Sequence, residues 1–205
     1  MSKIDCKIYS EKEIAIYEGL TRLMKEGANP YSIKVSDIAK AANIGKGTIY
    51  DYFNSKEEAI SKSIIYNIIN EIKNGFSRVV TKSNFKEKFY EILQIVAESL
   101  ENNLSTFNML LSAGGIKEFY EYIVDEKYDL SQFISVINNE VSNLLELGFN
   151  EGIISTKESD YYRLMTVRGA ISGFANYINN KDLYKDISMK DAMDTAYRIL
   201  IKALN

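Results

Sequence analysis

The sequence has no histidine and no tryptophan, and it has one cysteine and one proline among 205 residues. Without histidine, the chain lacks the commonest general base and the commonest neutral metal ligand. Because Cys6 stands alone, no internal disulfide can form, and we expect a reducing, cytoplasmic compartment. The charged N-terminus does not read as a signal peptide, and no run approaches the roughly 20 apolar residues that a membrane helix needs. We therefore expect no metal, no other cofactor and no membrane partner.

What is present points to an all-α fold. Hydrophobic residues make up 46% of the chain and charged residues 26%, and long stretches repeat apolar residues at helical spacing. Residues 1–56 hold nine Lys or Arg and seven Asp or Glu, a net charge of +2, whereas the remaining residues hold 16 and 21, a net charge of −5. The basic balance lies at the N-terminus, which favours a nucleic-acid partner for that part of the chain.

Several helix boundaries can be predicted from capping residues. Ser10 with Glu13, Ser55 with Glu58 and Ser155 with Glu158 have the spacing of capping boxes, and Ser188 is a further N-cap. We expect the first helix to end at Gly27 and a helix near 130 to close at Gly148 or Gly152. Other helices are expected near residues 85–100, 105–111 and 116–128. No Gly-, Ser- or Pro-rich linker follows Ser55, so a continuous helix should connect the two parts.

The stretch from Val35 to Lys56 predicts two short helices joined by a tight turn. Val35, Ile38, Ala39 and Ala42 form one apolar face, and Asn43 then favours a left-handed helix stop. A second helix is expected from Lys46 to Tyr52, with Ile49 and Phe53 buried beneath it. Two such helices make a helix-turn-helix, whose second helix can enter the DNA major groove.

This stretch closely resembles the DNA-binding signature of the TetR family of transcriptional regulators. The matching residues are Asp37-Ile38-Ala39-Lys40-Ala41-Ala42, Gly45-Lys46-Gly47-Thr48-Ile49-Tyr50, Tyr52-Phe53 and Ser55-Lys56-Glu57-Glu58. Two positions depart from the common pattern, because Gly45 stands where serine is frequent and Lys34 where Ser or Thr often caps the helix. The resemblance implies a three-helix DNA-binding domain over residues 1–55, followed by a C-terminal helical bundle domain over residues 56–205.

DNA-binding positions follow from the chemistry of the second helix and from the resemblance. Lysines neutralise phosphates, a tyrosine hydroxyl can donate to them, and a threonine can meet a base edge. Glycines let the backbone approach the strand. The predicted residues are Ser36, Gly45, Lys46, Gly47, Thr48, Tyr50, Asp51, Tyr52 and Lys56. For Asp51, an internally paired or solvated carboxylate is an equal alternative, and the role of Tyr52 is open in the same way.

The resemblance also implies a cavity for a small, largely apolar effector. The chain has 15 Tyr, nine Phe and six Met, and aromatic walls with a few hydroxyls suit such a ligand. The predicted lining residues are Phe89, Phe107, Met109, Phe133, Met165, Phe174 and Tyr177. The alternative for each of them is ordinary core packing.

A third predicted site is a homodimer surface on the last two long helices. Residues 168–175 are rich in small side chains that let helices approach closely, although packing within one chain is the alternative. The prediction is a repressor that binds a palindromic double-stranded operator as a homodimer and is released by an effector. Two alternatives stay open: a DNA binder without a ligand, linked to the nucleoid or to division, and an enzyme with a helical cavity.

Overall fold

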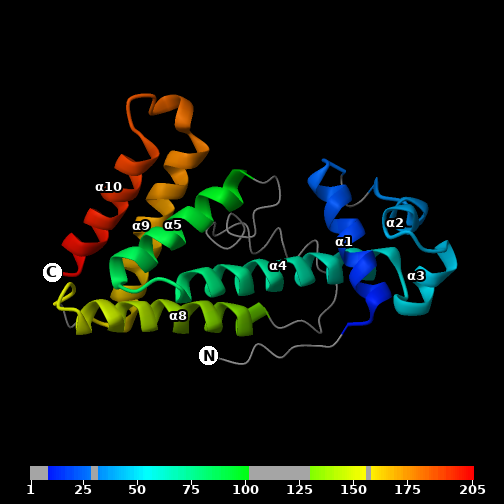
Figure 1. The fold of residues 1–205 in the computed structure, drawn as a ribbon, viewed down its shortest axis with the longest axis horizontal. Coiled ribbons are helices and arrows are strands. Elements are labelled where there is room, and N and C mark those ends of the chain that lie inside the picture. Colours follow the sequence, from blue (N-terminus) through cyan, green and yellow to red (C-terminus); the bar gives the residue numbers. More distant parts are fainter. Residues whose placement is uncertain (1–8, 29–31, 102–129, 156–157) are drawn as a thin grey trace. The chain divides into compact units, whose positions relative to one another are not determined.

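Helices and the turns between them make up the described part of the chain, which comprises residues 9–28, 32–101, 130–155 and 158–205 of the computed structural model. The elements are α1 (Glu11–Lys25), α2 (Val35–Ala41), α3 (Lys46–Tyr52), α4 (Lys56–Val80), α5 (Phe85–Glu101), α8 (Leu130–Asn150), α9 (Asp160–Asn179), a 3-10 helix (Lys181–Leu183) and α10 (Met189–Ala203) (Figure 1). This confirms the all-α prediction. The helices expected over residues 105–111 and 116–128 lie outside the described residues.

The chain divides into two compact units, and the division falls inside α4. The first unit includes the residues up to Lys73, and the second includes Asn74–Glu101 and Leu130–Asn205. α4 is one helix of 25 residues, as expected for a chain without a flexible linker at this point. The domain boundary between residues 55 and 56 stays a prediction.

In the first unit, α1 has the ends that the sequence predicts. The Ser10 hydroxyl accepts a hydrogen bond from the Glu13 amide at 3.3 Å, and the Glu13 carboxylate accepts from the Ser10 amide at 2.8 Å. Beyond the other end, Gly27 has a φ of 92°, a conformation that glycine adopts without strain. One face of α1 packs into a core shared with α2, α3 and α4, and its most buried members include Ile16, Tyr17, Leu20, Ile38, Ile49 and Phe53.

Two buried serines on α4 belong to the same unit. Ser61 and Ser63 are 1% and 0% exposed, although the sequence pattern places only apolar residues on the inner face. The Ser63 hydroxyl donates to the backbone carbonyl of Tyr17 at 2.9 Å, which satisfies its buried oxygen. This hydrogen bond ties α4 to α1 within the first unit.

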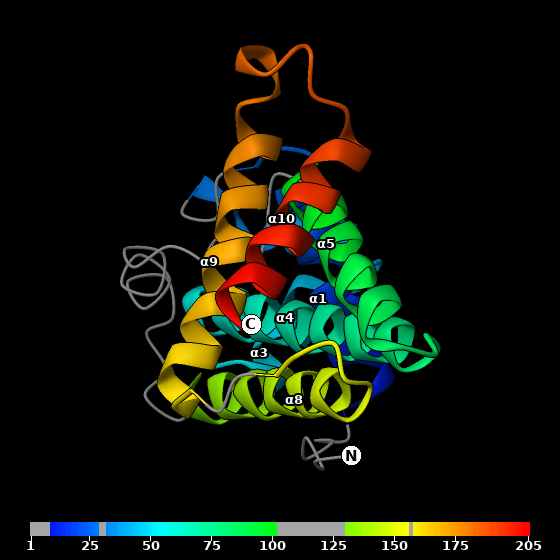
Figure 2. The ribbon, with the colours of Figure 1, turned by 90° about the vertical axis from the view of Figure 1, so that its left-hand side faces the viewer.

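The second unit is built from α5, α8, α9 and α10 together with the end of α4. α9 and α10 run side by side in opposite directions, and α5 packs against both (Figure 2). The buried side chains include Phe85, Phe89, Leu93, Val96, Leu144, Leu145, Val167, Phe174, Ala196 and Leu200. α8 ends at Asn150, close to Gly152 with its φ of 70°, so Gly152 and not Gly148 lies at the helix end.

The predicted capping box at the start of α9 is wrong. The N-cap is Ser159, whose hydroxyl accepts from the Tyr162 amide at 3.3 Å. Ser155 instead donates from its hydroxyl and its amide to the side chain of Asn205, at 2.5 and 2.9 Å. The competing partner is 50 residues away in sequence, which is why local spacing failed to predict the boundary.

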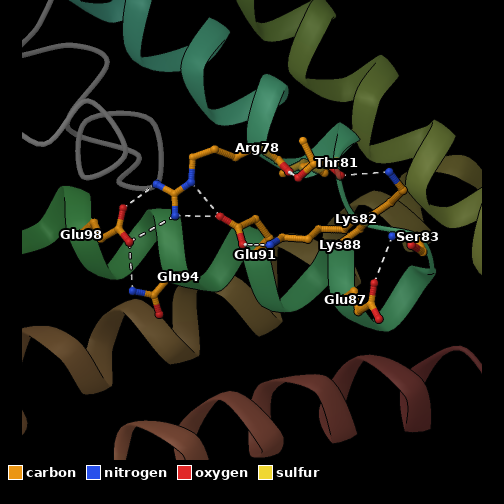
Figure 3. Close-up of polar contacts among 10 residues, drawn as sticks. Arg78, Thr81, Lys82, Ser83, Glu87, Lys88, Glu91, Gln94 and Glu98 are labelled. Carbon is orange, nitrogen blue, oxygen red and sulfur yellow. Dashed lines mark hydrogen bonds and ion pairs between the residues drawn. The ribbon is translucent and has the colours of Figure 1, made fainter.

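A network around Arg78 fastens the last turn of α4 to α5 (Figure 3). Arg78 Nε donates to Glu91 at 2.7 Å, and Nη1 and Nη2 donate to the two oxygens of Glu98 at 2.5 and 3.1 Å. Lys82 forms a second ion pair with Glu91 at 3.0 Å, and Gln94 donates to Glu98 at 3.0 Å. One arginine thus joins two carboxylates that lie two helical turns apart on α5.

The charges of this network are mutually stabilising. Hydrogen bonds from Arg78, first, and from Gln94 lower the pKa of Glu98. For Glu91, burial is the largest single influence, and it opposes ionisation of the carboxyl. The hydrogen bonds from Lys82 and Arg78 together outweigh burial, so the pKa of Glu91 is lowered. The pKa of the Arg78 guanidinium is raised, chiefly through its hydrogen bond to Glu98.

Within the described residues, no helix is long and apolar enough to span a bilayer.

Candidate nucleic-acid interface

The helix-turn-helix has the geometry that the sequence predicts. α2 ends at Ala41, and Asn43 then takes a φ of 54°, the left-handed conformation that reverses the chain. The Ile44 amide donates to the Ala39 carbonyl at 3.0 Å, so the turn is closed by a backbone hydrogen bond. Gly45 is the extended N-cap of α3, and it offers no side-chain cap.

One face of α3 is buried and the other is exposed. Ile49 and Phe53 are 0% and 2% exposed and belong to the core of the first unit, as predicted. Lys46, Gly47, Tyr50 and Asp51 are exposed, and Tyr50 keeps 54% of its surface in solvent. An apolar anchor beneath an exposed polar face is the arrangement that a helix entering a DNA groove needs.

Packing against other described residues does not explain Gly45, the N-cap of α3, or Gly47 in its first turn. A β-carbon at Gly47 would meet no atom within 4 Å, and one at Gly45 would meet only the Thr48 hydroxyl at 3.7 Å. Gly45 has a φ of −70°, which any residue can adopt. The fold therefore accepts a side chain at both positions.

Three further predicted DNA-binding residues lie on α2, at the end of α3 and at the start of α4. Ser36 is exposed at the start of α2, and Tyr52 is half-buried against the core. Lys56 Nζ lies 3.7 Å from the Glu57 carboxylate, and its side chain is 23% exposed. No hydrogen bond or ion pair joins the Asp51 carboxylate to another described residue. Their roles in DNA binding stay predictions.

Beside α3, a charged cluster holds the turn into α4. The Glu58 amide donates to the Ser55 hydroxyl at 3.0 Å, which is one half of the predicted capping box. The Glu58 carboxylate, however, accepts from the Asn54 amide at 2.7 Å, one residue before the expected partner. Hydrogen bonding to Lys62 is the main cause that lowers the pKa of Glu58, against the effect of burial. Lys62 also lies over the Phe53 ring, 5.7 Å from its centre.

The predicted ligand residues are not gathered at one place by the described structure. Phe89 and Phe174 are buried, whereas Met165 is 44% exposed on α9. Because Met165 and Phe174 are nine positions apart, they point to opposite faces of α9. The Tyr177 hydroxyl donates to the carbonyl of Ile187 at 2.8 Å. Phe107 and Met109 lie outside the described residues, as does the side chain of Phe133.

An open polar groove lies instead in the first unit. It has a volume of about 530 Å³ and runs between α1 and α4, with Thr21, Arg22, Tyr66 and Asn70 among its lining residues. Of the predicted ligand residues whose side chains the structure describes, Phe89, Met165, Phe174 and Tyr177, none lines it. Among the described residues, no three His, Cys, Asp or Glu side chains are grouped so that they could hold a metal ion.

Sequence reasoning missed one contact behind the interface. Arg22 of α1 donates to the carbonyl of Ala41, the last residue of α2, at 2.5 Å. Local spacing instead suggests that Arg22 would pair with Glu18 or Glu26 on its own helix. The only available signal is a glycine one turn earlier, Gly19, which marks a close approach of two helices.

Comparison with known proteins agrees with this geometry. The sequence profile of bacterial regulatory proteins of the tetR family matches residues 27–61. The fatty acid degradation regulator FadR from Bacillus halodurans has a similar fold, with a TM-score of 0.61, 18% identity and 97% of each chain covered. A TetR transcription regulator from Haloarcula marismortui gives a TM-score of 0.63 at 13% identity, over 96% of this chain and 97% of that one.

A third similar structure is FadR from Bacillus subtilis in complex with stearoyl-CoA. Its TM-score is 0.51 at 18% identity, over 94% of this chain and 97% of that one. At these identities the likenesses show a shared fold. Comparison with curated protein sequences gives no match.

The helix-turn-helix and its exposed second helix define a DNA-binding regulator. The profile match shows that residues 27–61 carry the motif of bacterial regulatory proteins of the tetR family, and the similar structures show that the chain shares the fold of such regulators.

Proposed function

We propose that the protein is a repressor that binds a palindromic operator as a homodimer and leaves it when a small, largely apolar effector binds. The observation that carries the proposal is the exposed face of α3, with Lys46 and Tyr50 outside and Ile49 fully buried beneath them. In this assignment Lys46 and Lys56 neutralise phosphates, and Thr48 meets a base edge.

The homodimer is proposed to form through α9 and α10. α9 has an exposed face on which Met165, Gly169 and Gly173 follow at intervals of four residues. β-Carbons at Gly169 and Gly173 would meet no atom within 4 Å, so a second helix has room to approach there. On α10, Ile199 is 50% exposed. Two-fold symmetry would bring two copies of α3 to half-sites one helical turn, about 34–36 Å, apart.

The effector is proposed to have a long apolar part. The Bacillus subtilis FadR structure contains stearoyl-CoA, which makes long-chain acyl-CoA thioesters the first compounds to test. The second unit offers buried aromatic residues such as Phe89 and Phe174, which suit an apolar chain. A binding pocket among them is part of the proposal.

Release is proposed to act through α4. The C-terminal part of this helix is held to α5 at three levels: a β-carbon at Gly75 would lie 3.8 Å from Ile95, Arg78 joins Glu91 and Glu98, and Lys88 donates to the Val79 carbonyl at 3.0 Å. A displacement of α5 by an effector would therefore move the end of α4 with it. Coupling between two sites is typically about 1–3 kcal/mol, or roughly 5- to 150-fold in affinity.

The test begins with selection of duplex DNA by the purified protein from a random pool. A palindromic consensus is expected, and Thr48→Ala should change the preferred base at one position in each half-site. Long-chain acyl-CoA and a wider panel of apolar and amphipathic compounds are then added to the complex. A compound that lowers the affinity for the selected duplex at least several-fold would support the proposed effector-released repressor. Many scattered genomic sites and no releasing compound would favour the ligand-free DNA binder.

Phe174 provides the test of the pocket. It is 2% exposed, so Phe174→Ala is expected to cost about 3–5 kcal/mol and can unfold the protein. Phe174→Leu keeps most of the apolar volume and should alter the effector response more than DNA binding without effector. If Phe174→Leu leaves the effector response unchanged, the pocket lies elsewhere.

A further inference from the structure

Two residues of α1, one helical turn apart, contact the same end of α2. A β-carbon at Gly19 would lie 3.0 Å from the carbonyl carbon of Ala41 and 3.0 Å from the amide nitrogen of Ala42. Arg22 donates from Nη2 to the Ala41 carbonyl oxygen at 2.5 Å. The glycine permits the close approach of the helices, and the arginine makes a hydrogen bond across it.

Arg22 bonds to the backbone of α2 and not to the carboxylates near it in sequence. Glu18 lies four residues before it on α1 and Glu26, the C-cap of α1, four residues after it, the spacing at which helical ion pairs form. Within the described first unit, the guanidinium pairs with neither carboxylate and extends to α2. The last carbonyls of a helix lack partners in their own helix, and a cation is favourable at that end. Arg22 thus caps the C-terminus of α2 from a neighbouring helix.

The end of α2 is also the start of the turn that leads into α3. The Asn43 amide donates to Lys40 at 3.2 Å and the Ile44 amide to Ala39 at 3.0 Å, so the turn is bonded directly to the last residues of α2. Only Ala42, Asn43, Ile44 and Gly45 separate the two helices. A shift at Ala41 is therefore passed to Lys46 and the exposed face of α3.

We propose that Arg22 is a positioning residue for operator recognition, which sets the placement of α3 without touching DNA. The inference rests on the proposed reading of DNA by α3. Sequence-specific contacts need side chains placed to within about 0.5 Å, whereas non-specific binding depends on the charge near the phosphates. Loss of the Arg22 contact should therefore weaken specific binding more than non-specific binding.

The experiment compares two duplexes, the sequence that the wild-type protein selects and a scrambled version of it. Arg22→Met should weaken binding to the selected duplex by roughly 10- to 150-fold, the scale of one hydrogen bond to a charged group. Binding to the scrambled duplex should change by less than about twofold, and the salt dependence should keep its slope. Arg22→Lys keeps the charge and should restore part of the specific affinity.

Two further variants and a local signal complete the test. Lys25→Met removes a neighbouring exposed charge of α1 that makes no hydrogen bond to α2, and it should leave the ratio of the two affinities unchanged. Gly19→Ala disturbs the same contact by bulk and should lower the ratio as Arg22→Met does. Amide hydrogen exchange at Asn43 and Ile44 should become faster in Arg22→Met, because the end of α2 is released.

Three outcomes would overturn the inference. Equal weakening on both duplexes with a slope reduced by about 0.9 would make Arg22 a phosphate contact. Equal weakening at constant slope, together with a lower melting temperature, would make it a residue of general stability only. Unchanged exchange at Asn43 and Ile44 would show that Arg22 does not hold the turn. If the wild-type protein selects no sequence, the proposed function fails instead, and the exchange measurement still decides the role of Arg22.

Discussion

Gly148 of α8 lies directly against the ring of Phe85 of α5. A β-carbon at Gly148 would stand 2.7 Å from Cδ2 of that ring and 2.8 Å from Cδ1 of Ile154. Phe85 and Ile154 are 0% and 3% exposed, so neither can move aside into solvent. The glycine is required by the packing of two helices and not by a helix end.

Gly148→Ala should therefore lower the free energy of unfolding by about 1–3 kcal/mol, the usual cost of overpacking a core. Gly75→Ala is the matched control, because a β-carbon there would lie 3.8 Å from Ile95, an ordinary contact. Alanine in place of a glycine inside a helix should stabilise the control by up to about 1 kcal/mol. Urea unfolding of both variants measures the difference, and equal effects would contradict the packing argument.

Lys46→Ala should weaken binding to every DNA sequence. Lys46 is exposed at the start of α3, where its ammonium can neutralise a phosphate. The slope of log affinity against log salt concentration should fall by about 0.9. Titrations of a fluorescent duplex at several salt concentrations measure this slope. An unchanged affinity and slope would remove Lys46 from the interface.

Gly47→Ala should affect the stability of the protein and its affinity for DNA differently. Nothing lies within 4 Å of the added methyl group, so stability should stay equal or rise by up to about 1 kcal/mol. If the backbone of α3 approaches the strand at this point, the methyl group should nevertheless reduce operator affinity several-fold. Thermal unfolding and DNA titration of the same preparation give both values. Wild-type affinity in a stable variant would place the strand away from Gly47.

Gly173→Glu should produce monomers. The position is exposed within the protomer and open to a side chain, so the substitution should not disturb the fold of one chain. At a close helix contact between two copies, it would bury an unpaired charge. Sedimentation should show a folded monomer that fails on a full operator, whereas Ser142→Glu on the exposed side of α8 should remain dimeric. A dimeric Gly173→Glu protein would move the interface elsewhere.

The Arg78 network predicts a pH-dependent contribution to stability. The pKa values of Glu91 and Glu98 are lowered in the folded protein, so the folded state favours their ionised forms. Their contribution is present above the unfolded pKa of about 4.3 and is lost as pH falls through the folded values. Arg78→Met should be less stable than wild type at pH 7, and this difference should shrink below about pH 4. A difference that is constant from pH 7 to pH 3 would contradict this account.

Local patterns predicted the helix-turn-helix well because its determinants lie close together in sequence. Asn43 supplies the left-handed turn, and Ile49 and Phe53 share one face of a short helix. The bounds of α3 follow from these residues alone. The same reasoning placed Lys46 and Tyr50 on the outside, where the structure has them.

The features that sequence reasoning missed depend on distant partners. Ser63 counts as polar in any periodic pattern, yet one hydrogen bond to the Tyr17 carbonyl lets it be buried. Arg22 has suitable carboxylates on its own helix and still pairs with Ala41. Gly148 suggests a helix end, but the packing of Phe85 explains it. In each case a contact with a residue distant in sequence determines the position of the side chain or the need for glycine. The local sequence does not identify that distant residue.

Because α3 is short, its helical structure depends on the rest of the first unit. It has seven residues and no side-chain N-cap, whereas isolated helices shorter than about 12–15 residues are marginal in water. Its helical state therefore depends on the burial of Ile49 and Phe53 in the shared core. A genetic screen for lost DNA binding should consequently recover many substitutions inside α1 and α4 that never approach a base pair. Such alleles would be temperature-sensitive, whereas alleles on the exposed face of α3 would be defective at every temperature.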